Sequence, residues 1–455
     1  MLAVAVLAAG KGTRMKSDLP KVLQELAGRS LLSWVLNSTK AIAFDRTLVI
    51  VGFGAEQVKA SLQDQSGLEF VLQAEQLGTG HAIQQLLQPL ADFQGELVVL
   101  TGDTPLLRAS TIANLVEFHR AQPRSATVLT AVLPDPTGYG RVFCDDHHRI
   151  SAIVEHRDCT AAQRLNARVS SGVYCFNWAE LAIALPKLTN NNAQQEFYLT
   201  EVFDYLDQVY ALDLVDHQES LGINDRLQLA QAYEVLQNRI KQDWMRQGVT
   251  MIMPETITID PDVQLATNVR LESQTHLRGK TQIGSGSKIG PASWIENSEI
   301  GADCQVWYSV VTASRVGDRV KIGPFAHIRG DSQIGSDCRL GNYVELKNAH
   351  LGNQTNAAHL SYLGDARIGS QVNIGAGTIT ANFDGKFKHI TTIGDRSKTG
   401  SNTVLVAPVG LGVNVNVAAG SVITQSVPDN ALAIARASQI IKPDYYDAQG
   451  QKKLK

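Results

Sequence analysis

Residues 321–346 read KIGPFAHIRGDSQIGSDCRLGNYVEL, and in this stretch an aliphatic residue recurs at every sixth position. Glycine follows several of these residues, as it does at Ile322 and Ile334. A period of six fits neither the face of a helix nor a stack of hairpins. It is typical of a parallel β-helix, in which one aliphatic side chain per hexapeptide points inward and the turns need small residues.

The same period continues on both sides of this stretch, with occasional five-residue steps and restarts of the register. Its positions are Leu265, Leu271, Leu277, Ile283, Ile289, Ile295, Ile300, Val306, Val316, Ile322, Ile328, Ile334, Leu340, Leu346, Leu351, Ala357, Leu363, Ile368, Ile374, Ile393, Thr399, Leu405, Leu411, Val417 and Ile423. The segment between Ile374 and Ile393 overruns the period. We therefore expect a loop to leave the β-helix there, and insertions in repeat proteins commonly lie at the binding face.

Before the repeat, the pattern is that of an α/β fold. Apolar strand-like runs at 2–7, 47–51, 69–72 and 96–100 alternate with helical stretches. This alternation predicts a Rossmann-like, mostly parallel sheet covered on both faces, with ligands bound beyond the carboxyl ends of its strands. Between the two patterns, apolar residues at steps of three and four over 224–248 predict one helix. The expected organisation is a domain at 1–225, a linker helix at 226–250 and a β-helix domain at 251–455.

The run VAVLAAGKGTRM at 4–15 resembles a strand that delivers a phosphate-binding turn. The spacing of Gly10 and Gly12 does not fit a P-loop, and Met15 stands where a dinucleotide fingerprint needs its third glycine. Spacing alone therefore leaves a purely structural turn as an alternative.

Composition excludes several classes of partner. The chain has 455 residues, a formal net charge of −3 and five cysteines, without a C-x-x-C pair. This argues against nucleic acid, an anionic membrane surface, a zinc site or a disulfide framework, and it favours a reducing cytoplasm. The apolar start is short, lacks a basic region and runs into the glycine turn, so we expect a buried strand rather than a secretion signal.

Specific motifs then identify a resemblance. The N-terminal part contains LAAGKGTRM, LPK, QAEQLGTGHA, TGDTPLL, DPTGYGR and EHRD, and it resembles the sugar-1-phosphate nucleotidyltransferases. The β-helix contains NAHLGNQTNAAHLSYLGDARIGSQVNIGAGTITANFDG and resembles a hexapeptide acyltransferase. Together, over nearly the whole chain, they resemble the bacterial bifunctional N-acetylglucosamine-1-phosphate uridyltransferases and glucosamine-1-phosphate acetyltransferases. For that family the β-helix is left-handed and the assembly a homotrimer.

The resemblance implies that the N-terminal domain transfers UMP from UTP to N-acetylglucosamine 1-phosphate, giving UDP-N-acetylglucosamine and pyrophosphate. The implied nucleotide and sugar residues are Leu7, Ala8, Ala9, Gly10, Arg14, Lys21, Gln73, Gly78, Thr79, Thr101, Gly102, Gly140, Glu155, Ser170 and Asn224. Asp103 and Asn224 match the ligands of Mg²⁺, which prefers oxygen donors and few protein groups. Taken alone, Asp103 or Asn224 could instead cap a helix, and Lys21 could be solvated.

For the β-helix the resemblance implies acetylation of glucosamine 1-phosphate by acetyl-CoA, with His359 as the general base. The implied substrate and acetyl-CoA residues are Arg329, Lys347, Tyr362, Asn373, Ala376, Asn382, Phe383, Ser401, Ala419 and Arg436. A surface histidine and solvated cations are the structural alternatives. Ser170, Phe383, Asn348 and Ala381 depart from the commonest pattern of the family.

Two other functions stay open at this level. The β-helix could serve only for assembly or regulation of a nucleotidyltransferase, or the chain could be a non-catalytic regulatory subunit. The presence of His359, Tyr362 and the inserted loop argues against the first alternative. The presence of Asp103 and Lys21 argues against the second.

Overall fold

The computed structural model describes residues 1–446 and 448–452. It divides into two compact units, Met1–Gln237 and Asn238–Lys455, whose boundary falls inside helix α6 (Arg226–Arg246). The helix predicted over 224–248 is confirmed, whereas the domain limits at 225 and 250 stay a prediction. Within the described residues, no helix has the length and apolar character needed to span a membrane.

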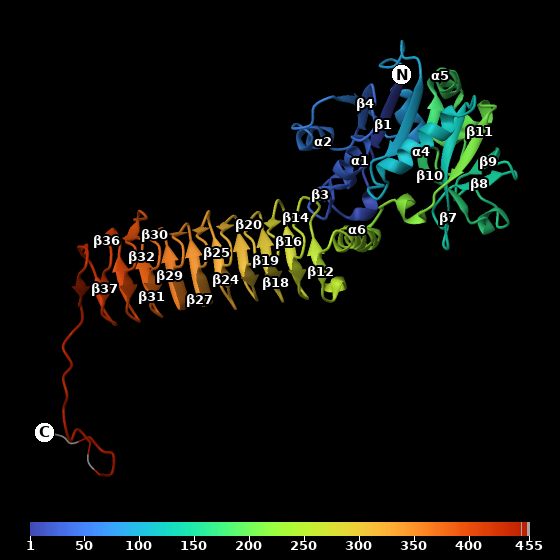
Figure 1. The fold of residues 1–455 in the computed structure, drawn as a ribbon. Coiled ribbons are helices and arrows are strands. Elements are labelled where there is room, and N and C mark those ends of the chain that lie inside the picture. Colours follow the sequence, from blue (N-terminus) through green and yellow to red (C-terminus); the bar gives the residue numbers. More distant parts are fainter. Residues whose placement is uncertain (447, 453–455) are drawn as a thin grey trace. The chain divides into compact units, whose positions relative to one another are not determined.

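The N-terminal unit is built on a mixed, mostly parallel sheet (Figure 1). Its main path runs β11 (Val209–Asp213), β7 (Ala126–Val132), β10 (Arg168–Asn177), β6 (Glu96–Thr101), β1 (Leu2–Ala8), β4 (Arg46–Val51) and β5 (Leu68–Leu72). Only β10 runs antiparallel to its neighbours on this path. The short strands β8 (Arg141–Cys144) and β9 (Ile150–Val154) join at its side, and β2 (Glu25–Leu26) pairs with β3 (Arg29–Ser30). The predicted strands are confirmed.

Helices cover both faces of this sheet, as the apolar strands predict. Ala3 and Ala5 of β1 pack into one core, with residues of α3 (Thr79–Gln84) and α5 (Trp178–Ala184). Val4 and Val6 pack into the other core, with α1 (Leu31–Thr39), α2 (Ala55–Ser61) and α4 (Ala109–Arg120). Because successive side chains of a strand point to opposite faces, a continuous apolar run fills both cores.

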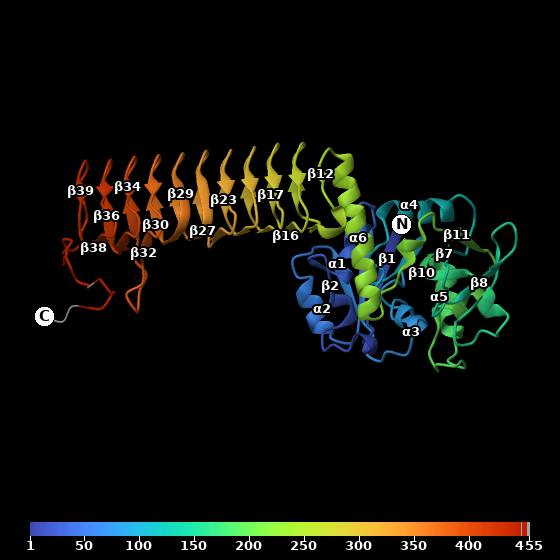
Figure 2. The ribbon, with the colours of Figure 1, turned by 90° about the horizontal axis from the view of Figure 1, so that it is seen from below.

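The C-terminal unit is a parallel β-helix whose successive coils pair in three ladders (Figure 2). The first ladder contains β12 (Thr250–Met251), β15 (Arg270–Leu271), β18 (Lys288–Ile289), β21 (Gln305–Val306), β24 (Lys321–Ile322), β27 (Arg339–Lys347), β29 (Asn356–Gly364), β31 (Asn373–Ile374), β34 (Lys398–Thr399), β37 (Asn416–Val417) and β39 (Leu432–Ala433). The second contains β13 (Thr258–Ile259), β16 (His276–Arg278), β19 (Trp294–Glu296), β22 (Val310–Thr312), β25 (His327–Arg329), β32 (Ile379–Ala381), β35 (Val404–Val406) and β38 (Val422–Ile423), and it shares β27 and β29 with the first. The third contains β14 (Gln264–Leu265), β17 (Gln282–Ile283), β20 (Glu299–Ile300), β23 (Arg315–Val316), β26 (Gln333–Ile334), β28 (His350–Leu351), β30 (Ala366–Ile368), β33 (Thr391–Ile393) and β36 (Val409–Leu411).

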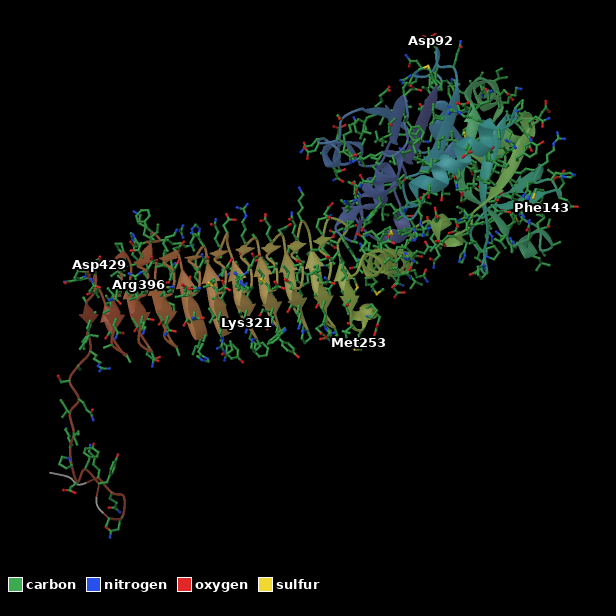
Figure 3. The ribbon with its side chains drawn as sticks, viewed as in Figure 1. Asp92, Phe143, Met253, Lys321, Arg396 and Asp429 are labelled. Atoms are coloured by element: carbon green, nitrogen blue, oxygen red, sulfur yellow. The ribbon has the colours of Figure 1, made fainter. Side chains whose placement is uncertain are left out.

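The predicted inward positions are confirmed throughout this unit. Each of them is buried, and the largest exposed fraction among them is 8%, at Leu265. On β24, for example, Ile322 is buried and Lys321 is exposed (Figure 3). Val311, which a strict period of six leaves out, is also buried. It lies five residues after Val306 and five before Val316, and so continues the series of inward positions.

The inserted loop begins later than the sequence pattern suggests. Thr380 on β32 is still buried at the inward position, six residues after Ile374. The chain therefore leaves the β-helix only at residues 382–390 and returns with β33, and this loop projects from the coils in Figure 2.

Candidate functional site

A pocket of about 330 Å³ opens at the carboxyl ends of β1, β5 and β6 in the N-terminal unit. It is lined by Leu7, Ala9, Gly10, Lys11, Lys21, Val22, Gln73, Gln76, Gly78, Thr79, Ala82, Thr101, Asp103 and Glu196. Nine of these residues were predicted from the sequence, whereas Lys11, Val22, Gln76, Ala82 and Glu196 were not. The pocket lies where open α/β sheets bind ligands.

Cations and oxygen ligands converge beside this pocket. Lys21, in the short 3₁₀ helix Lys21–Leu23, donates from Nζ to Asp103 Oδ2 and, over 3.2 Å, to Asn224 Oδ1. Arg14 donates from Nη2 to the same Asn224 oxygen over 2.9 Å. Gly12, at φ 67°, takes the left-handed conformation two residues before Arg14.

The Asp103 and Asn224 oxygens both contact one cation, the Lys21 ammonium, and therefore face a common point. One carboxylate and one amide carbonyl suit Mg²⁺, which keeps waters and phosphate oxygens as its other ligands. Within the described residues, no group of three or more His, Cys, Asp or Glu side chains could hold a metal. This donor set accordingly fits Mg²⁺ and does not resemble a zinc site.

The helix-cap alternatives for these two ligands are wrong. Asp225, not Asn224, caps α6, because its side chain accepts a hydrogen bond from Gln228 N at 2.8 Å. The Gln228 side chain in turn accepts from Asn224 N at 2.7 Å. Helix α4 begins after Arg108, well beyond Asp103. Neither side chain is therefore used to cap a helix, and both accept from Lys21.

The three residues predicted to surround the sugar lie close to one another. The Gly140 carbonyl accepts from Ser170 N at 2.9 Å, and a Cβ at Gly140 would lie 3.3 Å from Glu155 Oε2. Thr200 donates to Glu155 Oε1 at 2.9 Å. Burial raises the pKa of Glu155, although the Thr200 hydrogen bond opposes this. Ser170 Oγ lies 3.0 Å from the Tyr174 hydroxyl, so this shorter side chain is anchored to the sheet.

In the β-helix, His359 is exposed on β29 and in register with Asn342 on β27. Its Nδ1 lies 3.1 Å from Asn342 Oδ1. A carbonyl oxygen can only accept, so Nδ1 carries the hydrogen and Nε2 is the acceptor nitrogen. Asn342 was not predicted, and only the register between coils reveals it.

Cations gather on the same coils. Arg329 and Lys347 are direct neighbours on β25 and β27. Arg329 donates to Glu345 Oε1 at 2.6 Å. The nearby Lys388 side chain of the inserted loop disfavours a second positive charge beside it and so lowers the pKa of Lys347. Two ammonium groups held together beside a guanidinium mark a place for an anion. Lys388 was not predicted, and the basic residues of the loop were its only signal in the sequence.

The loop residues predicted near the cofactor differ in exposure. Asn382 is 7% exposed and donates from Nδ2 to Asp365 Oδ2 at 2.5 Å. Asn348, where the family pattern has a second lysine, donates to the other oxygen of Asp365 at 2.6 Å. The Asn382 side chain is thus tied to Asp365, and its backbone carbonyl accepts from His389 N at 2.8 Å. Phe383, by contrast, is 61% exposed.

The other residues predicted for acetyl-CoA line up on successive turns. Gly377 N donates to Leu360 O at 2.6 Å, Asn402 N to Ala376 O at 2.7 Å, and Gly420 N to Ser401 O at 2.8 Å. Arg436 Nη1 donates to Ala419 O at 2.5 Å. These turns form one column that begins next to His359. Tyr362 pairs with Ile379 on the second ladder, and Asn373, on the first, pairs with Asn356.

Comparison with known proteins agrees with both halves of the chain. Residues 4–166 match the family described as "MobA-like NTP transferase domain", and residues 313–348 match "Bacterial transferase hexapeptide (six repeats)". Proteins called "Bifunctional protein GlmU" are similar over almost their full length. The one from Acaryochloris marina is 58% identical, covering 98% of both chains. That from Nostoc sp. is 58% identical over 99% of this chain and 100% of its own, and that from Cyanothece sp. 59% identical over 98% of both.

Proposed function

Because this chain belongs to the GlmU family of bifunctional proteins and is a bifunctional uridyltransferase and acetyltransferase, we propose which substrates each unit uses and which residues act on them. The β-helix acetylates glucosamine 1-phosphate with acetyl-CoA. The N-terminal unit transfers UMP from UTP to the resulting N-acetylglucosamine 1-phosphate. The products of the second reaction are UDP-N-acetylglucosamine and pyrophosphate.

The observation that carries the uridyltransferase assignment is the convergence of Arg14, Lys21, Asp103 and Asn224 beside the pocket. A phosphate oxygen of the sugar attacks the α-phosphorus of UTP, and the bond from that phosphorus to the bridging oxygen of the β-phosphate breaks. Both reactants are anionic, so the main tasks of the site are neutralisation and in-line positioning. Arg14 and Lys21 supply fixed positive charge, and no protein nucleophile is needed.

Asp103 and Asn224 would hold Mg²⁺, which when bound supplies further positive charge to the phosphates. Lys21 would then pair with substrate phosphate in place of its two present partners. On the sugar side, Gly140, Glu155 and Ser170 offer hydrogen-bonding groups, with Glu155 oriented by Thr200. The base lies against Gln73, Gly78 and Thr79.

In the β-helix, the acceptor nitrogen Nε2 of His359 takes the proton from the amine of glucosamine 1-phosphate. The amine nitrogen forms a bond to the thioester carbonyl carbon of acetyl-CoA, the carbon–sulfur bond breaks, and CoA leaves as the thiolate, which takes up the proton that His359 removed from the amine. Asn342 holds the imidazole through Nδ1, so the tautomer is set before substrate arrives. Arg329, Lys347 and Lys388 bind the sugar phosphate. Acetyl-CoA lies along the column of turns that ends at Arg436.

The protein acts as a cytoplasmic homotrimer in this proposal. Trimer formation is supported by a column of exposed aromatic rings on the β-helix: Tyr308 and Phe325 have ring centroids 5.8 Å apart, and Phe325 and Tyr343 5.5 Å apart. These rings are 46%, 53% and 56% exposed, in chain order, and would be covered between subunits. Light scattering of the active enzyme tests this assembly.

The substrate assignment is tested by supplying glucosamine 1-phosphate, acetyl-CoA, UTP and Mg²⁺, and following each product by mass spectrometry. Without UTP, N-acetylglucosamine 1-phosphate should accumulate. Without acetyl-CoA, no sugar nucleotide should form unless N-acetylglucosamine 1-phosphate is added. Uridylation of glucosamine 1-phosphate without any acetylation would instead mean that the β-helix serves only for assembly or regulation.

A further inference from the structure

We propose that His81, which lies behind the nucleotide pocket, fixes the amide of Gln73 so that its oxygen faces the base, and that this makes the site select uracil over cytosine. His81 is a positioning residue in this inference, because it acts through Gln73. The inference rests on the proposed function, in which Gln73 contacts the base.

Gln73 is 3% exposed and lines the pocket immediately after β5. Its Nε2 lies 3.0 Å from the Gly78 carbonyl oxygen and 3.1 Å from His81 Nδ1. An amide nitrogen carries two hydrogens, so these two contacts use both of them. Among the described residues none donates to Gln73 Oε1, and this oxygen is the polar atom that remains for a ligand.

The Gly78 carbonyl and His81 together set the orientation of this amide. A carbonyl oxygen can only accept, so it favours Gln73 Nε2 and opposes a flip that would bring Oε1 against it. With Nε2 held there, the neighbouring His81 Nδ1 must be the unprotonated, accepting nitrogen of the ring. His81 thereby stabilises the one orientation that presents Oε1 to the pocket.

Gln85 competes with Gln73 for a hydrogen bond to the His81 ring. His81 Nε2 lies 3.1 Å from Gln85 Nε2, which also donates to the His81 carbonyl oxygen at 3.0 Å. A neutral imidazole accepts at only one nitrogen. Gln73 is buried and fixed on two sides, whereas Gln85, which follows α3, is partly exposed, so Gln85 is the side chain that adjusts. Nδ1 consequently keeps the role of acceptor.

Uracil and cytosine differ at the atom that such an oxygen would meet. Uracil carries a hydrogen on N3 and can donate to Gln73 Oε1. Cytosine has an unprotonated N3, which would face the oxygen lone pairs and leave two acceptors unpaired. A site built to hydrogen-bond one group rejects an analogue that cannot make the bond. Without the His81 acceptor, only the Gly78 carbonyl opposes rotation of the amide, so Gln73 can more readily turn and offer Nε2 to cytosine.

The test is the ratio of kcat/KM for UTP to kcat/KM for CTP in uridyl or cytidyl transfer to N-acetylglucosamine 1-phosphate. His81→Leu removes the acceptor but keeps an apolar side chain near Phe197, whose ring centroid is 6.2 Å from that of His81. The ratio should fall about tenfold to a hundredfold. His81→Asn keeps an acceptor in this place, because Asn Oδ1 is the same number of bonds from the backbone as His Nδ1. This variant should keep the ratio within about threefold of wild type.

Gln73→Leu separates this inference from the proposed contact of Gln73 with the base. It removes the amide oxygen itself, so the ratio of UTP to CTP should fall strongly whether or not His81 positions the amide. If Gln73→Leu leaves the ratio unchanged, Gln73 does not read the base, and both the base contact proposed for Gln73 and the role of His81 are overturned, while the proposed uridyl transfer stands. If Gln73→Leu collapses the ratio and His81→Leu does not, only the role of His81 is overturned. Equal losses in His81→Leu and His81→Asn would also overturn it. Should His81→Leu fold poorly, His81→Met, which likewise lacks the acceptor, takes its place.

Discussion

Adding a single methyl group at Gly12 should disable uridyl transfer and leave acetyl transfer intact. Gly12 has a φ of +67°, and a Cβ there would lie 2.5 Å from Lys21 Cβ. Ordinary van der Waals contact starts at 3.4 Å, so the two segments must separate by about 0.9 Å. The Lys21 Cβ position does not change with side-chain rotation, and the ammonium that contacts Asp103 must therefore move with its backbone.

Two effects contribute to the expected size. Alanine in the left-handed conformation of Gly12 is strained, which lowers the free energy of unfolding by roughly 1–2 kcal/mol. A displacement of about 1 Å in a positioning group can lower the rate about 100-fold. The assay compares two rates in Gly12→Ala. The kcat/KM for pyrophosphate release measures uridyl transfer, and the kcat/KM for CoA release measures acetyl transfer.

Gly67→Ala is the matched control. Gly67 also has a positive φ, +79°, but a Cβ there meets nothing within 4 Å, and Gly67 does not line the nucleotide pocket. It should show a similar loss of stability with nearly unchanged uridyl transfer. If Gly12→Ala changes uridyl transfer no more than Gly67→Ala does, or lowers acetyl transfer equally, the account of how Gly12 positions Lys21 is refuted.

Three further predictions concern separate groups. Asp103→Asn, or removal of Mg²⁺ with a chelator, should abolish most pyrophosphate release and spare CoA release, since only one site uses the metal; equal loss of both activities would contradict two separate sites. His359→Ala should abolish CoA release, and Asn342→Leu should lower it about tenfold or more by freeing the imidazole tautomer, with uridyl transfer unchanged in both. Burial lowers the pKa of His119 from 6.5 to about 4. Its contribution to stability is therefore fully present above pH 6.5 and lost as the pH falls towards 4, by on the order of 3 kcal/mol relative to His119→Gln in chemical unfolding; parallel curves for the two proteins would show that His119 is not responsible.

The β-helix could be predicted from the sequence because every coil gives its inward residue the same environment. The buried position of each hexapeptide can therefore be identified from its local sequence, without information on contacts between distant residues. The two misses have local causes. Val311 is reached by steps of five, and Thr380 is a buried polar residue that an aliphatic pattern does not recognise. The inserted loop was for that reason placed several residues too early.

The nucleotide site could not be assembled in this way. Lys21 is 82 residues from Asp103 and 203 from Asn224, and no local period relates them. Their roles were predicted by resemblance alone, and the structure adds that their side chains meet. It also shows why Asn224 is available: Asp225 caps the helix in its place.

The residues that sequence reasoning missed in the β-helix follow from register. Asn342 precedes His359 by 17 residues, one coil along the same ladder, and Glu345 precedes Tyr362 by the same interval. A site built on paired coils fixes the spacing between its groups through backbone pairing, as it does for Asn342 and His359. Lys388 is the exception, because it reaches Lys347 from a loop outside the ladders. Shortening this loop should therefore weaken binding of the sugar phosphate while the pair of Asn342 and His359 stays in place, so KM for glucosamine 1-phosphate should rise more than kcat falls.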